Sequence, residues 1–133
     1  MGSRFLVDTN IIIYVFTQGL SDRLAEKMNQ IFQDSFNISV INKIKFLGWK
    51  EASPDEHRQA IDFLSNAHVL GIDDPVIEKT IELKRTLKIK PPDAVIAATC
   101  LVNHLGLLTR NVKDFSGIKN LIVSNPFCEE NEC

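Results

Sequence analysis

The sequence has few of the residues that define several protein classes. Its three cysteines cannot form a disulfide framework, because Cys100 lies in an apolar run and Cys128 and Cys133 lie in the acidic segment "CEENEC". We expect a small buried thiol at Cys100 and a reducing compartment for the protein. The three histidines are far apart in the sequence, so no histidine–cysteine cluster predicts a zinc site.

Long apolar runs are also missing, and none approaches the length that crosses a membrane. The apolar segment "FLVDTNIIIYVF" is interrupted by Asp8, Thr9 and Asn10, which are unfavourable in the core of a signal peptide. The net charge of -2 gives no reason to expect nucleic acid to coat the whole surface, although it allows a local basic patch. We therefore expect a cytoplasmic protein with no membrane partner.

The residues that are present describe an ordinary globular chain. A length of 133 residues, 44% of them hydrophobic and 24% charged, is typical of one soluble domain. We predict that residues 1–126 form this domain and that residues 127–133 form an acidic, frayed tail.

Short apolar, β-branched runs alternate with helical patterns along the chain. They predict strands at 4–8, 36–40, 68–72, 107–109 and 120–125, and helices at 10–16, 21–34, 53–67, 73–89 and 91–106, with a further helix after the second strand within 38–52. Ser53, Pro54 and Glu56 mark one helix start as a capping box. No strand joins the next through a two-residue hairpin. The pattern therefore predicts an α/β fold with a mainly parallel sheet flanked by helices.

Three acidic residues follow predicted strands or open a predicted helix. Asp8 ends the first strand, Asp93 opens the alanine-rich helix, and Asp114 follows the strand at 107–109. Because parallel sheets bind ligands beyond the carboxyl ends of their strands, all three are expected along one rim. Each alone is as readily a helix cap or a solvated acid. Together they repel one another unless a cation is present, and carboxylate oxygens favour Mg²⁺ or Mn²⁺.

A lysine stands out in the segment "ISVINKIKFLGWKEA" at 38–52. A helical period predicts one apolar face here, made of Ile41, Ile44, Leu47 and Gly48. The same period predicts that Asn42, Lys43 and Phe46 project on the far side. Lys45 is then expected at the edge of the apolar face, an unusual place for a solvated lysine.

Four segments, in order, resemble the signature stretches of PIN-domain ribonucleases, specifically the VapC-type toxins of type II toxin–antitoxin pairs. They are "FLVDTNIIIY", "ISVINKIKFLGW", "KIKPPDAVIAAT" and "LLTRNVKDF…SNPF". The resemblance implies a Rossmann-like PIN fold and endoribonuclease activity that depends on Mg²⁺ or Mn²⁺. It also implies an RNA substrate, a cognate antitoxin and a homodimer.

The resemblance further implies an active site of four acids. Asp8, Asp93 and Asp114 match the first, third and fourth of them, which are the expected metal ligands. The second is normally a glutamate in a pattern like "ISxIxKIEFLGW", and here Lys45 stands at that position. Three polar residues match family positions or flank the first acid, where they would either orient the acids, water or metal or act only as structural caps: Asn10, Thr109 and Asn111.

Lys45 changes the charge of this set. The four positions carry a formal charge of −2 instead of −4, and an ammonium stands where a dication belongs. Two unit charges at ~4 Å interact by about 4 kcal/mol at an effective dielectric constant of ~20. We therefore expect Lys45 to act as an internal counter-ion for Asp8 or Asp93, with weak metal binding and weak or absent RNA cleavage. The lysine is either natural to an inert domain or a substitution that protects the host from an active toxin. The alternative is a tolerated surface lysine whose ammonium extends into solvent.

Basic and large apolar residues allow two interpretations each. Basic groups near the rim can hold RNA phosphates or simply be solvated and complement the helix dipole: Lys84, Arg85, Lys88, Lys90, Arg110 and Lys113. Large apolar groups can pack in the core or form a homodimer or antitoxin surface: Met28, Ile31, Phe32, Phe46, Trp49 and Phe63.

Two other functions remain open. An inert PIN domain would bind RNA or an antitoxin without cutting. A phosphoaspartyl hydrolase would use Asp8 as its nucleophile, but Asn10 stands where that class generally needs a second aspartate. Nucleotide binding is weaker still, because no glycine-rich loop follows the first strand.

Overall fold

The structure, a computed structural model, describes residues 4–18, 22–34 and 36–127. These residues form a five-stranded sheet in the order β3-β2-β1-β4-β5, in which every neighbouring pair is parallel. The strands are β1 (Phe5–Val7), β2 (Asn37–Ser39), β3 (His68–Leu70), β4 (Gly106–Leu108) and β5 (Val123–Ser124). The helices are α1 (Thr9–Gln18), α2 (Asp22–Asp34), α3 (Val40–Leu47), α4 (Pro54–Leu64), α5 (Asp74–Thr86), α6 (Pro91–Val102) and the short η1 (Val112–Phe115). The predicted α/β fold is confirmed.

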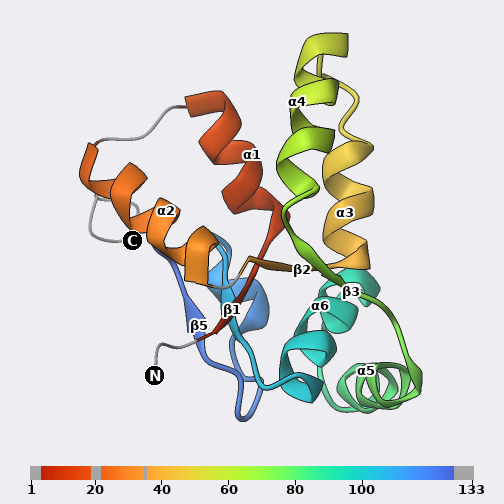
Figure 1. Ribbon diagram of the computed structural model, residues 1–133. Helices are drawn as coiled ribbons and strands as arrows, with labels where there is room; N and C mark the ends of the chain where they lie inside the picture. The colour runs from red at the N-terminus through yellow and green to blue at the C-terminus, as the bar shows by residue number, and fades with distance from the viewer. Residues whose placement is uncertain (1–3, 19–21, 35, 128–133) are drawn as a thin grey trace.

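Helices cover both faces of the sheet (Figure 1). Because side chains alternate along a strand, Leu6 and Leu107 pack into a core with α5 and α6. The next residues, Val7 and Leu108, pack into a second core with α1, α2, α3 and α4. Both faces of the central strands are therefore buried, which explains why their sequences are continuously apolar.

The predicted buried face of α3 is wrong. Asn42 and Phe46 are its buried residues, whereas Ile44 is 63% exposed. Hydrophobic periodicity assigned Asn42 to solvent because it is polar, but its side chain finds hydrogen-bond partners inside the fold. The helix also ends at Leu47, earlier than the segment suggested, and Gly48 is its C-cap. A side chain on Gly48 would meet the Ile44 carbonyl oxygen at 2.8 Å, which favours glycine at this position.

Other local predictions are closer to the structure. The capping box of Ser53 and Glu56 is present at the start of α4. The Cys100 thiol is buried and free, and burial raises its pKa to about 12. The last predicted strand shortens to Val123–Ser124, and the first predicted helix lengthens to Thr9–Gln18.

The end of the described chain packs on the second core. Phe127 is fully buried, and its ring centroid lies 4.5 Å from that of Tyr14 on α1. The rest of the predicted tail, with Cys128 and Cys133, lies outside the described residues. No helix in the described ranges has the length and apolar character needed to span a membrane.

Candidate functional site

The central strands β1 and β4 create a crevice at their carboxyl ends. The chain continues from β1 to β2 and β3 on one side, and from β4 to β5 on the other. Ligands of open parallel sheets bind where the strand order reverses in this way. Asp8 follows β1, and its backbone N–H donates to the carbonyl of Leu108 over 2.9 Å. Thr109 follows β4, so both residues lie at the crevice.

Asp8 is held by three hydrogen bonds although only 6% of it is exposed. The backbone N–H of Thr9 donates to Oδ1 over 2.8 Å, and Asn42 Nδ2 donates to the same oxygen over 3.1 Å. The Thr109 hydroxyl donates to Oδ2 over 2.9 Å. The carboxyl group is therefore fixed in orientation by residues from three elements or loops.

Asn42 is a site residue that our sequence patterns missed. Its Nδ2 also donates to Thr9 Oγ1 over 3.1 Å, and its Oδ1 accepts from the Ser39 backbone N–H at 2.9 Å and hydroxyl at 3.0 Å. Ser39 in turn accepts from the Asn42 backbone N–H, which completes a capping box. The Ser-x-x-Asn spacing in the sequence could have predicted this contact, because in a capping box the side chain of the third helical residue turns back toward the N-cap.

Thr109 supports Asp8 from the β4 side and is itself held by hydrogen bonds. Asn10 Nδ2 and the backbone N–H of Asn111 both donate to the Thr109 hydroxyl over 3.1 Å. The Asn10 side-chain oxygen accepts from the Arg110 backbone N–H over 3.2 Å. Thr109 is therefore placed to orient Asp8, while Asn111 contributes through its backbone.

The other predicted charged residues lie on α6, η1 and α3. Asp93 is half-buried in the first turn of α6, Asp114 is exposed in η1, and Lys45 is exposed on α3. Asp8 interacts electrostatically with Lys45 and Asp93, and Asp93 interacts with Lys45 and Asp114. We call Asp8, Asp93 and Asp114 the acidic edge.

Burial opposes ionisation at the acidic edge. It raises the pKa of Asp8, while the hydrogen bonds from Thr109 and Thr9 and the charge of Lys45 act in the opposite direction. Burial likewise raises the pKa of Asp93, against the charge of Lys45 and with that of Asp114. Lys45 thus acts on two carboxyl groups, although among the described residues it forms no direct ion pair with either.

The acidic edge does not form a complete metal site. In the described part of the chain, no three histidine, cysteine, aspartate or glutamate side chains lie close enough together to hold one ion. The carboxylate oxygens suit Mg²⁺ or Mn²⁺ by kind. However, Asp8 already accepts three hydrogen bonds, and Lys45 supplies a cation where a fourth acid was expected. The residues present therefore fit a divalent cation poorly.

Two of the predicted phosphate-binding cations have contacts within the protein. Lys84 Nζ donates to the Ile89 carbonyl over 2.7 Å, and the Arg110 guanidinium lies 4.3 Å from the centre of the Tyr14 ring. The remaining basic residues of that group are exposed: Arg85, Lys88, Lys90 and Lys113.

Comparison with known proteins identifies the class. The family model of the PIN domain matches residues 5–121, so the chain belongs to the PIN-domain family. No curated protein matches the chain.

Solved structures of toxin–antitoxin complexes have the same fold. A toxin–antitoxin complex from Klebsiella pneumoniae is 32% identical, covers 92% of this chain and 97% of its own, and has a TM-score of 0.74. DNA-bound VapBC from Salmonella typhimurium is 22% identical, with 94% and 99% coverage and a TM-score of 0.78. VapBC2 from Rickettsia felis, bound to a promoter DNA fragment, is 23% identical, with 91% and 97% coverage and a TM-score of 0.76. The predicted resemblance to VapC-type PIN domains is confirmed.

Proposed function

We propose that this chain is the toxin of a toxin–antitoxin pair, a Mg²⁺- or Mn²⁺-dependent endoribonuclease whose activity is impaired by Lys45. The family match and the 32% identity to a toxin–antitoxin complex over nearly the whole chain support the class. The observation that carries the proposed impairment is the charge of Lys45 acting on both Asp8 and Asp93 at the carboxyl edge of the sheet.

The acidic edge explains why a lysine is harmful at this position. A divalent cation stabilises charge that develops on a scissile phosphate, and it needs several carboxylates around it. Lys45 both removes a carboxylate and adds a positive charge that repels the cation. Asn42 and Thr109 still hold the Asp8 carboxyl in place, so the polar support of the site is intact while its charge balance is wrong.

The test is the Lys45→Glu variant. A repulsion of even a third of the ~4 kcal/mol expected for close charges corresponds to about tenfold in binding. We expect Lys45→Glu to bind Mn²⁺ at least tenfold more tightly in isothermal titration calorimetry and to cleave single-stranded RNA measurably faster.

Lys43→Glu is the matched control, because Lys43 is exposed on the same helix and the substitution changes the net charge equally. It should leave Mn²⁺ binding and cleavage as in the unmodified chain. Equal cleavage by the unmodified chain and Lys45→Glu would overturn the proposed role of Lys45.

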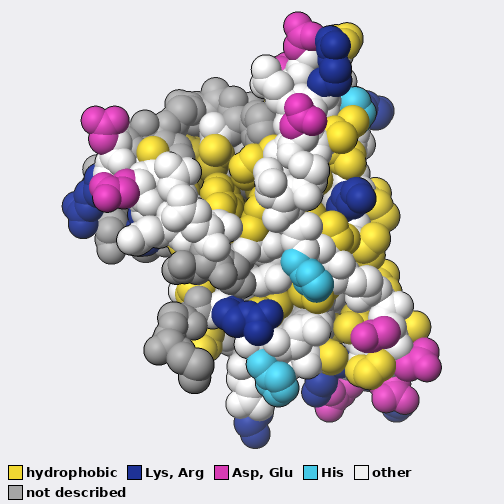
Figure 2. Space-filling model, viewed as in Figure 1, with side chains coloured by type: hydrophobic (Ala, Val, Ile, Leu, Met, Phe, Trp, Pro, Cys, Tyr) yellow, Lys and Arg dark blue, Asp and Glu magenta, His cyan; other side chains and the backbone are white. Residues whose placement is uncertain are grey.

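The alternative is an inert PIN domain that binds RNA or an antitoxin without cutting. An apolar hollow between α2 and α4 favours a protein partner (Figure 2). Phe32 on α2 and Phe63 on α4 pack with Phe36, with ring centroids 4.8 to 5.3 Å apart, and Phe32 and Phe63 are half-buried. Of the other large apolar residues, Met28 and Phe46 are buried in the core.

We include an antitoxin on this hollow, a homodimer and a cytoplasmic location in the proposal. Phe63→Ser should weaken binding of the antitoxin encoded beside this gene and leave RNA cleavage unchanged. If Lys45→Glu binds the antitoxin but neither binds Mn²⁺ nor cuts RNA, the inert binding domain is the correct function.

A further inference from the structure

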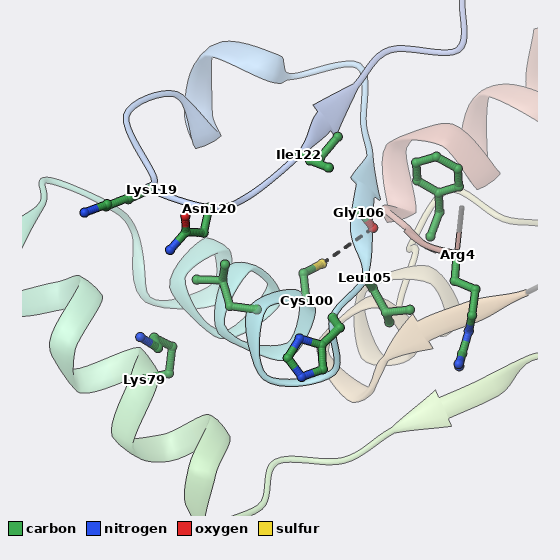
Figure 3. Close-up of a pocket in the computed structure, with 11 residues that line it drawn as sticks. Arg4, Lys79, Cys100, Leu105, Gly106, Lys119, Asn120 and Ile122 are labelled. Carbon is green, nitrogen blue, oxygen red and sulfur yellow. Dashed lines mark hydrogen bonds between the residues drawn. The ribbon is translucent and has the colours of Figure 1, made fainter. Parts of the chain in front are cut away.

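A second cavity lies at the opposite end of the sheet from the acidic edge. It has a volume of about 610 Å³ and is lined by residues at the amino ends of β1 and β4 and just before β5, together with α5 and the end of α6. Buried Cys100 lies at its inner end, where its thiol donates to the Gly106 carbonyl over 3.9 Å (Figure 3). We call it the amino-end cavity.

The cavity is positively charged in a chain whose net charge is -2. Arg4, Lys79 and Lys119 line it, and none of its lining residues is acidic. Lys79 on α5 and Lys119 on the loop before β5 lie on one side of the cavity, and Arg4 lies on the other (Figure 3). Lys79 also forms an ion pair with Glu82 at 2.6 Å, which balances part of its charge.

Part of the remaining wall is apolar. Phe5 is half-buried, Leu105 is buried, and Ile122 is 69% exposed. A pocket with an apolar wall and a few convergent polar groups is the usual form of a small-molecule site, and its volume lies in the usual range of ~300–1,000 Å³.

The backbone around the cavity is strained at two positions. His104 (φ 58°) and Asn120 (φ 70°) are the residues other than glycine with positive φ in the described chain, and both line the cavity. His104 follows the C-cap of α6, where the Leu105 N–H donates to the Cys100 carbonyl over 2.8 Å. Glycine is favoured at such a position, so the imidazole is placed beside the cavity at a cost in backbone strain.

We propose that the amino-end cavity binds a small phosphate monoester the size of a nucleoside monophosphate. Its phosphate would contact Lys79, Lys119 and the Asn120 amide, and its organic group would pack against Phe5 and Ile122. A bare phosphate leaves most of the volume empty. The closed inner end favours a compact ligand over a continuous RNA strand. The proposal is independent of nuclease activity, because the cavity and the acidic edge lie at opposite ends of the sheet.

The test uses AMP as the probe, with adenosine, inorganic phosphate and a short single-stranded RNA as separate titrations into the full chain. We expect AMP to bind more tightly than adenosine or phosphate alone. The double variant Lys79→Gln/Lys119→Gln should weaken AMP binding at least tenfold. The matched control Lys43→Gln/Lys50→Gln removes two exposed cations outside the cavity and should change AMP binding little.

His104→Gly separates binding from folding. Because glycine fits the positive φ, this variant should melt at the same temperature or higher. It also removes an imidazole that lines the cavity, so it should bind AMP more weakly. The proposal is overturned if AMP gives no binding at millimolar concentration, if adenosine binds as well as AMP, or if the double variant binds AMP normally. RNA binding that is lost in the double variant without any AMP binding would assign the cavity to RNA instead.

Discussion

The Asp8 carboxyl is fixed by three hydrogen bonds, yet burial still raises its pKa above the ordinary value of 3.8. A carboxyl of this kind favours the folded state when it is protonated. Its stabilisation is fully present below the pKa of the unfolded chain and is lost as the pH rises through the folded pKa. The site therefore works against the stability of the domain at neutral pH.

Asp8→Asn tests this linkage. The amide keeps the size of the side chain but cannot ionise, so the variant should gain stability relative to the unmodified chain as pH rises. We expect the difference in unfolding free energy, measured by urea denaturation, to favour the variant more at neutral pH than at about pH 4. A difference that is constant, or larger at the lower pH, would contradict the raised pKa.

Asn42 is the residue on which both Asp8 and the start of α3 depend. Asn42→Ala removes a donor to Asp8 and an acceptor for the Ser39 N–H, both of them buried. Unsatisfied buried groups and the loss of the side-chain half of the capping box predict a cost of about 2–3 kcal/mol in urea denaturation. Ser53→Ala, at the exposed capping box of α4, should cost only about 1 kcal/mol. If both variants lose the same unfolding free energy, the buried hydrogen bonds of Asn42 add nothing to stability.

The α5–α6 connection shows how one basic residue can serve the fold. Lys84, in the last turn of α5, donates to the Ile89 carbonyl just before α6. Two interpretations of the basic cluster were open from sequence, and this contact assigns Lys84 a structural role. The exposed Lys88 lies in the same connection, so it is a suitable control for Lys84.

Lys84→Met should therefore lower the unfolding free energy by about 1 kcal/mol, the usual net contribution of one hydrogen bond. Lys88→Met should leave stability nearly unchanged and should weaken RNA binding more than Lys84→Met does, measured by filter binding at low salt. The reverse order in RNA affinity would show that Lys84 contacts RNA despite its bond to Ile89.

On the scale of the whole molecule, the sheet separates two cores, and the end of the described chain belongs to one of them. Phe127 packs in the second core with Val7, Leu108 and Tyr14. Phe127, the first residue of the predicted tail at 127–133, is therefore part of this core. The boundary at residue 126 is a prediction that truncation can test.

Phe127→Ala should cost about 3–5 kcal/mol, because it removes a fully buried aromatic ring. Ile122→Ala, at a mostly exposed position, should change stability by less than about 0.5 kcal/mol. If the domain ends at Phe127, deleting residues 128–133 should change the unfolding free energy as little as Ile122→Ala does. Chemical denaturation of the three variants measures these differences, and a small effect of Phe127→Ala would exclude its role in the core.

The sequence predicted the elements and the class because these depend on local chemistry. Buried parallel strands need continuous apolar runs, and Ser53 with Glu56 forms its box within four residues. The PIN signature segments likewise carry their information in short, ordered stretches, and the family match confirms them.

Tertiary structure decided what depends on residues distant in sequence. Hydrophobic periodicity predicts that Asn42 faces solvent. In the structure Asn42 is buried and donates a hydrogen bond to Asp8, 34 residues away in the sequence. Thr109 donates a hydrogen bond to Asp8, 101 residues away in the sequence, because β1 and β4 are neighbours in the sheet. The amino-end cavity arises in the same way, from strand ends and a helix that meet only in the fold. Local sequence encodes which elements form, whereas the burial and hydrogen bonds of a polar side chain are fixed only when the chain closes around it.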